Sequence, residues 1–480
     1  MPIVPGIMRA FQKNKTSSFF ALISLPSTAM GFALSIQISA LSWILTTQYD
    51  LDIHDVGLVW AAGPLAGIIG QVLIGVISDR VWFWNGRRRP FILIGGVLAA
   101  LMLLALPNLD VISASMGVGG ILGVAIAVAL TLDLAINVSF NPTRSIIADV
   151  TEDGDERTKG YTWMQTISGT FGVAAYAVGA IWNNYVLIYA GAVIVLLFSI
   201  LPPLFITEPK ELEEPENSES PEAAPGNEDS FRNILVAIRP LWAFLVYDVY
   251  AMTIRLAHIE VENYYAEFIC LAATVLLVIQ AMLEKDPAGQ PGLASFRKVI
   301  AAHSFSWVGI QTTFVFLFAY LQQTLPDLSD IDLGRVGSSS FLVLNAVGAL
   351  LPAFVLMPIA HRIGRIKTHA LSLACMAAGY TGLYFYGATP MQIYALMAVV
   401  GIGWAAIVSL PFAIVSQKVN QARMGLYMGL FNLSVVLPQL VVSLGIALFV
   451  SRATDKGVIF AISAISLALS AVSWSLIEED

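Results

Sequence analysis

The chain has 480 residues, of which 57% are apolar and 12% are charged, against about 25% charged residues in ordinary soluble domains. This composition excludes a water-soluble enzyme, which needs a polar shell, and a disordered chain, which contains few apolar residues. The only two cysteines, Cys270 and Cys375, lie in apolar segments, which excludes a disulfide-stapled fold. The net charge of −8 indicates little about partners, because much of it lies in one short segment.

The amino-terminal segment is basic and precedes a long apolar stretch. Arg9, Lys13 and Lys15 come before apolar residues 19–45. This stretch is too long for the apolar core of a cleavable signal peptide, and it lacks a clear small-residue cleavage site. We therefore expect a first transmembrane helix here.

Apolar runs recur along the whole chain, and one bilayer crossing needs about 20 apolar residues. The expected fold class is therefore all-α, a polytopic membrane protein. The pattern predicts fourteen spans, at 19–46, 56–79, 90–107, 116–148, 160–182, 184–206, 236–256, 264–283, 299–325, 336–360, 367–387, 391–416, 424–450 and 457–476.

The distribution of Lys and Arg predicts the orientation of these spans. With the amino terminus in the cytoplasm, all but five of the 25 basic residues fall on the cytoplasmic side. Arg144 lies within a span, and the four outside are Arg255, Arg335, Arg452 and Lys456. Because short cytoplasmic loops carry an excess of positive charge, we expect both termini to be cytoplasmic in a multi-pass cell-membrane protein.

One polar segment, from Thr207 to Ser230, is rich in Glu and Pro. It cannot bury apolar surface, so we interpret it as a flexible cytoplasmic linker. The predicted domains are a six-helix half (1–206), the linker (207–235), an extra helix pair (236–290) and a second six-helix half (291–480).

An internal repeat supports the two halves. Pro142 and the later Gly160-Tyr161 have counterparts at Pro411 and Gly425-Leu-Tyr427, with offsets of 269 and 265 residues. Parallel repeats of six helices describe the major facilitator architecture. The linker and the extra helix pair account for the additional length between the repeats.

A charged turn joins the second and third predicted spans. It ends one span with Asp79-Arg80 and begins the next with Gly86-Arg87-Arg88-Arg89-Pro90. Such a cluster can pair with neighbouring helix ends in one conformation and release them in another, or it can act only as a topology signal. The pattern resembles the loop between helices two and three of major facilitator transporters. The proposed cytoplasmic gate contains Asp79, Arg80, Arg87, Arg88, Arg89, Asp149 and Arg423.

The fourth span carries a polar stripe. Asp133, Asn137, Asn141 and Arg144 are spaced by four, four and three residues, which places them on one helical face. An intramembrane Asp or Arg costs about 2.5–3.5 kcal/mol, so such residues face a cavity or a partner. Asp133 and Arg144 lie about 16 Å apart along the axis and cannot pair directly. The stripe indicates either a transport path or a structural polar network between helices.

This span resembles the fourth helix of the plant sucrose transporters and their animal and bacterial relatives, in the glycoside–pentoside–hexuronide:cation symporter group. The family pattern falls on Asp133, Asn137, Pro142-x-Arg144 and Ala148-Asp149. Further matches occur in both halves, at Gly86-Arg87-Arg88-Arg89-Pro90-Phe91-Ile92, Pro411-Phe412-Ala413, Met428-Gly429-Leu430-Phe431-Asn432-Leu433 and Pro438-Gln439. The chain departs from the family in having Phe140-Asn141 where Gln-Gly is usual, and in the extra helix pair.

The resemblance implies a proton-carrying role for Asp133, because a carboxyl in a partly dry cavity can bind a proton on one side and release it on the other. Sugar recognition needs polar side chains beside an aromatic face. The candidate substrate-binding residues are Gln37, Asn137, Asn141, Arg144, Gln165, Trp307, Gln311, Thr312, Trp404, Asn432 and Gln439.

The expected function is proton-coupled symport of a disaccharide or glucoside, of the sucrose or maltose type, by alternating access. The partners are then a sugar, a proton and the bilayer, with the monomer as the functional unit. The alternatives are a sodium-coupled glycoside symporter and a non-transporting membrane sugar sensor. No nucleophile–base set, metal cluster or phosphate loop appears in the sequence. We therefore expect no enzyme activity, no metal, no cofactor and no nucleic-acid partner.

Overall fold

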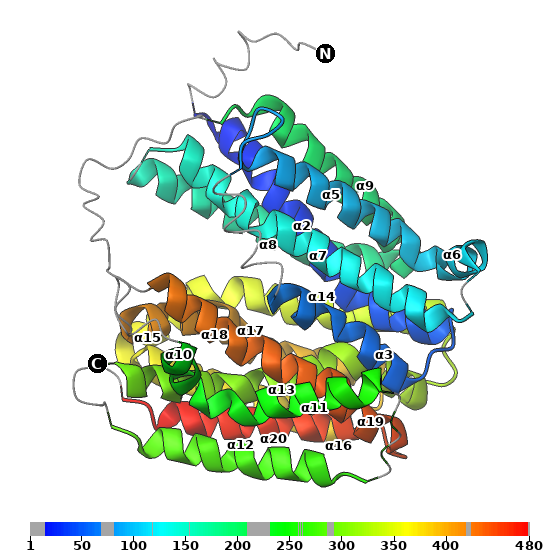
Figure 1. The fold of residues 1–480 in the computed structure, drawn as a ribbon, viewed down its shortest axis with the longest axis vertical. Coiled ribbons are helices and arrows are strands. Elements are labelled where there is room, and N and C mark those ends of the chain that lie inside the picture. Colours follow the sequence, from blue (N-terminus) through cyan, green and yellow to red (C-terminus); the bar gives the residue numbers. More distant parts are fainter. Residues whose placement is uncertain are drawn as a thin grey trace. The chain divides into compact units, whose positions relative to one another are not determined.

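A computed structural model describes residues 15–68, 81–117, 119–152, 154–208, 231–257, 259, 261, 263–285, 292–418 and 424–478 (Figure 1). Within these residues the regular structure is helical, and the one β-bridge joins Phe83 to Gly86. The expected all-α class is confirmed.

The chain divides into two compact units. Unit 1 contains Met1–Leu51, Ala62–Glu216 and Asp327–Leu342, and unit 2 contains Asp52–Ala61, Asn217–Pro326 and Val343–Asp480. These bounds place 52–61 and 327–342 differently from the predicted domains, and that domain division stays a prediction. The helices of unit 1 are α2 (Ser17–Thr47), α5 (Arg89–Ala105), η1 (Leu106–Asn108), α6 (Leu109–Met116), α7 (Ile121–Val150), α8 (Asp155–Ile181) and α9 (Asn184–Phe205).

Unit 2 holds the later helices and one short early one. Helix α14 (Asp330–Leu351) begins in unit 1 and continues in unit 2. The other helices of unit 2 are α3 (Ile53–Trp60), α10 (Phe231–Ala237), η3 (Arg239–Leu241), α11 (Trp242–Leu256), α12 (Tyr265–Leu283), α13 (Leu293–Thr324), η4 (Pro352–Leu356), α15 (Met357–Ile363), α16 (Arg365–Tyr386), α17 (Pro390–Lys418), α18 (Met424–Val441), η6 (Val442–Ile446), α19 (Ala447–Arg452) and α20 (Val458–Ser475).

Ten helices in the described part of the chain are long and apolar enough to cross a membrane. The four other predicted spans also have helical counterparts: α3 with residues 62–68, α8, α11 and α16. Each of the fourteen predicted spans therefore overlaps a helix of the described residues, and residues 69–79 of the second span lie outside them. The chain is a multi-pass membrane protein.

Small and hydroxylated residues bring the helices together. In unit 2, α13 packs along α20, where the hydroxyls of Ser306 and Ser470 lie 2.7 Å apart and those of Thr313 and Ser463 lie 3.1 Å apart. Lipid tails are as apolar as the helices, so close packing and hydroxyl hydrogen bonds hold membrane helices together instead of hydrophobic burial. This close packing fixes α13, which carries several of the predicted substrate-binding residues.

Hydroxyl hydrogen bonds between closely packed helices also occur in unit 1. Helix α2 packs against α7, α8 and α9, which run beside it in Figure 1. Ser39 on α2 lies 2.6 Å, oxygen to oxygen, from Ser338 on the first part of α14, and Ser338 donates to Asn184 at 2.7 Å. This buried network joins α2 to the first part of α14 and to the start of α9.

Candidate functional site

The central feature of unit 1 is a buried pair between α2 and α7. Gln37 on α2 donates from Nε2 to Oδ2 of Asp133 on α7, over 2.9 Å. Both side chains are buried, with 4% and 5% exposed. Gly63 lets the backbone lie close to the Asp133 carboxylate, because a Cβ at this position would be only 3.3 Å from an Asp133 oxygen. The sequence predicted both polar residues, but their spacing of 96 residues gave no sign that they meet.

Asp133 has no cationic partner among the residues that the structure describes. Its carboxylate receives the amide hydrogen bond from Gln37, and Asn137 donates from Nδ2 to the Asp133 backbone oxygen at 2.8 Å. An intramembrane carboxyl is costly to keep charged without a partner. The arrangement is therefore suited to a group that gains and loses a proton.

The remaining predicted residues of unit 1 are more open. The Arg144 guanidinium stacks on the Phe140 ring, 4.4 Å from its centroid, and the Arg144 side chain is exposed. Asn141 is partly buried on α7, and Gln165 is exposed on α8. None of the ion pairs in the described residues joins Arg144 to Asp133.

Unit 2 carries a second group of predicted residues, on α13, α17 and α18. Gln439 donates from Nε2 to Gln311 Oε1 at 3.2 Å, and Trp307 meets Trp404 edge to face with ring centroids 6.4 Å apart. Asn432 is partly buried. Amides beside indole rings can bind the hydroxyls and the apolar face of a sugar ring.

Asn345, His303 and Phe431 lie beside this group, and the sequence analysis assigned no binding role to any of them. Trp404 donates from Nε1 to Asn345 Oδ1 at 3.1 Å, and Trp307 donates to His303 Nε2 at 2.9 Å. His303 also stacks on Phe431, at 4.7 Å between ring centroids. Thr312 was predicted to bind substrate, but its side chain is fully buried. Its hydroxyl donates to the backbone oxygen of Val308 in the same helix.

The charged turn before α5 is held within unit 1. Arg88 Nε lies 3.2 Å from Asp149 Oδ2 at the end of α7, and both side chains are less than a tenth exposed. Arg87 and Arg89 flank this pair and are partly buried. Asp79, Arg80 and Arg423, also predicted for the gate, lie outside the described residues.

Glu208, which the sequence analysis missed, organises this turn. Its carboxylate accepts hydrogen bonds from the backbone N–H groups of Arg87, Arg88 and Arg89, at 2.7, 2.8 and 2.7 Å. A carboxylate suits a helix N-terminus, whose first N–H groups have no partner inside the helix. The sequence marked this position in part, since Glu208 is the second residue after the sixth predicted span, 184–206.

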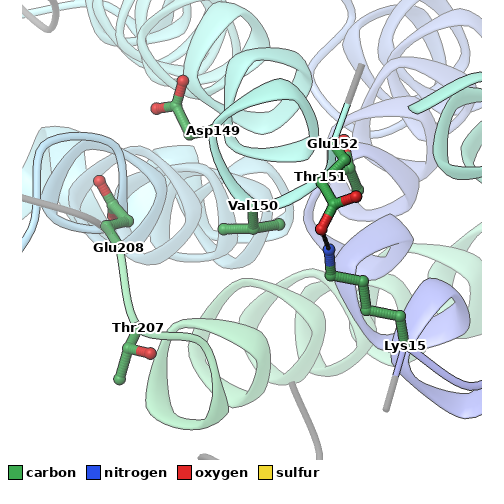
Figure 2. Close-up of a pocket in the computed structure, with 7 residues that line it drawn as sticks. All are labelled: Lys15, Asp149, Val150, Thr151, Glu152, Thr207 and Glu208. Atoms are coloured by element: carbon green, nitrogen blue, oxygen red, sulfur yellow. Dashed lines mark ion pairs between the residues drawn. The ribbon is translucent and has the colours of Figure 1, made fainter. Parts of the chain in front are cut away.

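A cavity of about 410 Å³ lies beside this cluster. Figure 2 shows Asp149 and Glu208 on one side of Val150, and the Lys15–Glu152 pair on the other. Lys15 also pairs with Glu156, at 2.6 Å. The acidic lining is therefore neutralised in part by one amino-terminal lysine.

We expect Glu208→Ala to destabilise unit 1. Three backbone donors lose a charged acceptor, and one hydrogen bond to a charged group contributes about 1.5–3 kcal/mol. Thermal unfolding of the purified chain in detergent should show a lower midpoint for Glu208→Ala. Glu478→Ala, near the other end of the chain, serves as the control. Equal midpoints in the two variants would mean that water replaces the carboxylate without loss.

The comparisons with known proteins agree with this architecture. Residues 23–443 match the model of the Major Facilitator Superfamily. The Sucrose transport protein SUC3 of Arabidopsis thaliana is 24% identical over 505 residues, which cover 90% of this chain and 83% of that protein. The General alpha-glucoside permease of Schizosaccharomyces pombe and the Sucrose transport protein SUC4 of Arabidopsis thaliana are each 30% identical, over 35% of this chain. The matched segments span only 33% and 34% of those two proteins.

Solved structures show the same fold. The nucleoside transporter NupG superposes with a TM-score of 0.60 at 13% identity, over 96% of this chain and 100% of that one. The inward-open xylose transporter XylE from E. coli superposes with a TM-score of 0.57 at 14% identity, over 96% of each chain. At these identities the two likenesses show the fold alone. With most of its length matched by the family model, the chain belongs to the Major Facilitator Superfamily.

Proposed function

We propose that the protein transports a sugar, and that it couples the uptake of a disaccharide or other glucoside to the entry of a proton by alternating access. The named activities of the sucrose and alpha-glucoside relatives support a sugar substrate. We also propose that it works as a monomer in the cell membrane with both termini in the cytoplasm, as its Lys and Arg distribution favours.

The observation that carries proton coupling is the buried Gln37–Asp133 pair. A carboxyl held by one neutral amide, inside a membrane-spanning helix, can alternate between a protonated and an ionised form as its access to water changes. Bound sodium instead requires several oxygen ligands around the ion. In the described residues, the hydrogen bond to the Asp133 carboxylate comes from an amide donor, so the arrangement favours a proton.

The groups in the two units suit a sugar for different reasons. Unit 1 offers the amides of Asn137 and Asn141 and the guanidinium of Arg144 along α7. The amides can donate to and accept from sugar hydroxyls, and the guanidinium can bind them through its planar fork of donors. Unit 2 offers Trp307 and Trp404 beside Gln311 and Gln439. Indole rings present a flat apolar surface to a sugar ring, while the N–H groups of these two indoles donate to Asn345 and His303.

The test is uptake of radiolabelled sucrose, maltose and trehalose by proteoliposomes that contain the full chain. Each sugar is offered with an imposed proton gradient, a sodium gradient or no gradient. We expect at least one sugar to accumulate under the proton gradient alone, and a proton ionophore to abolish the accumulation. Accumulation that requires sodium would replace proton coupling, and saturable binding without flux would replace transport by sensing.

A further inference from the structure

Two cavities in unit 2 meet at one hydrogen-bonded pair of side chains. Tyr247 on α11 donates from its hydroxyl to Glu267 Oε1 on α12, over 2.8 Å. Both residues line a cavity of about 330 Å³, and both also line a second cavity of about 360 Å³. The extra helix pair therefore encloses space together with the helices of the carboxy-terminal half.

The first, which we call the apolar cavity, is lined mainly by aromatic and aliphatic side chains of α11, α12, α13 and α20. Phe244, Phe268, Phe305 and Leu469 are examples. The π-helical turn η6 forms part of its wall, and a Cβ on Gly445 would collide with the Tyr247 hydroxyl. The tyrosine ring thus lies directly on the backbone of this turn, and π-helical turns frequently occur at functional sites.

The second, which we call the cationic cavity, is lined by His54, Arg255 and Arg452 together with the shared Tyr247 and Glu267. Arg255, in the last turn of α11, lies 3.3 Å from His54 Nδ1 and donates to the Leu444 backbone oxygen at 3.4 Å. Arg452 places its guanidinium 5.6 Å from the centre of the Tyr264 ring.

Polar capacity remains unused around this cavity. Asp55 and Asp52 act on the charge of Arg255, but no ion pair in the described residues joins its guanidinium, which has five N–H donors, to a carboxylate. Glu267 Oε2 is buried and accepts no hydrogen bond in the same part of the chain. The site therefore offers a cation and a hydrogen-bond acceptor beside an apolar cavity.

We propose that these joined cavities bind an anionic phospholipid whose headgroup carries hydroxyl groups. One acyl chain occupies the apolar cavity, and the phosphate binds Arg255, with Arg452 adding positive charge. A headgroup hydroxyl donates to Glu267 Oε2. Arginine suits this role because its planar fork matches the oxygens of a phosphate.

The headgroup must determine the selectivity of such a site. An acyl chain that leaves the bilayer for the apolar cavity moves between two apolar surroundings, so it gains little from the hydrophobic effect. The charged contact at Arg255 distinguishes one lipid from another. This proposal assigns a role to α11 and α12, and it does not depend on which solute is transported.

The test is native mass spectrometry of the full chain, released from detergent after incubation with equal amounts of phosphatidylglycerol and phosphatidylcholine that carry the same acyl chains. We expect phosphatidylglycerol to be retained about tenfold more, the ratio that corresponds to about 1.4 kcal/mol. Arg255→Gln should bring the ratio close to one, and Arg255→Lys should retain part of it. Arg362→Gln, an exposed arginine of α15 in the same unit, is the matched control and should leave the ratio unchanged.

A second variant tests the acyl-chain part of the site. Ile465 lines the apolar cavity from α20 and is 62% exposed, so Ile465→Trp can fill the cavity without displacing buried neighbours. It should lower the retention of both lipids to a similar extent. Equal retention of the two lipids by the native chain, or a preference that survives Arg255→Gln, overturns the proposal. Displacement of the lipid by free glycerol phosphate at equal concentration also overturns it, since the site would then bind a soluble anion.

Discussion

Replacing Asp133 by asparagine should abolish the uphill accumulation of sugar under a proton gradient and leave the protein folded. The amide has nearly the shape of the carboxyl and can still bond to Gln37, which lies 2.9 Å away. It cannot take up or release a proton. One proton that crosses 100 mV supplies about 2.3 kcal/mol, enough to concentrate a solute more than tenfold, and this driving force is lost.

Asp133→Asn should lose uphill accumulation but retain exchange. Exchange of labelled for unlabelled sugar needs no net proton movement, and the amide resembles the protonated acid, so we expect exchange to persist. Asp110→Asn, an exposed acid on α6 in the same unit, is the matched control and should accumulate sugar normally. If Asp133→Asn still concentrates sugar in proteoliposomes under the proton gradient, the coupling proton is carried elsewhere.

The fold was largely predictable because apolar length and spacing encode membrane helices directly. The stripe on α7 was also predictable, since helical periodicity alone places Asp133, Asn137, Asn141 and Arg144 on one face. The ends of the helices were harder to predict, because polar residues can continue a helix beyond the apolar span. Helix α7 extends to Val150 and so includes Asp149, which the sequence placed after the span.

The contacts between helices were not predictable, because they join residues far apart in the chain. Gln37 could be selected as polar, but its hydrogen bond to Asp133 follows from the way α2 packs on α7. The role of Glu208 was not predictable for the same reason, since its three backbone partners lie about 120 positions earlier in the chain. The cavities beside α11 and α12 depend on a π-helical turn, which no residue pattern in the sequence marks.

The second large effect concerns the buried ion pair between Arg88 and Asp149. Removing one partner leaves a charge that is less than a tenth exposed, and this costs about 3–5 kcal/mol in buried pairs. Arg88→Met alone should therefore lower the unfolding midpoint in detergent by several degrees. Replacing both partners with apolar residues often restores stability, so Arg88→Met with Asp149→Leu should recover most of the loss. The exposed pair Asp332–Arg335, with 46% and 43% of its side chains exposed, is the control, and its loss should cost at most about 1 kcal/mol.

Transport by the stable double variant then distinguishes the two interpretations of the charged turn. A contact can bias a conformational equilibrium only if it differs between the two states. If the turn is a gate, its charged groups form and release contacts during each cycle, and an apolar pair cannot reproduce this. We therefore expect the Arg88→Met, Asp149→Leu chain to unfold near the native temperature but to turn over several-fold more slowly at saturating sugar. A native turnover rate in this variant would show that the ion pair only stabilises unit 1, and that the basic residues of the turn serve to orient the chain in the membrane.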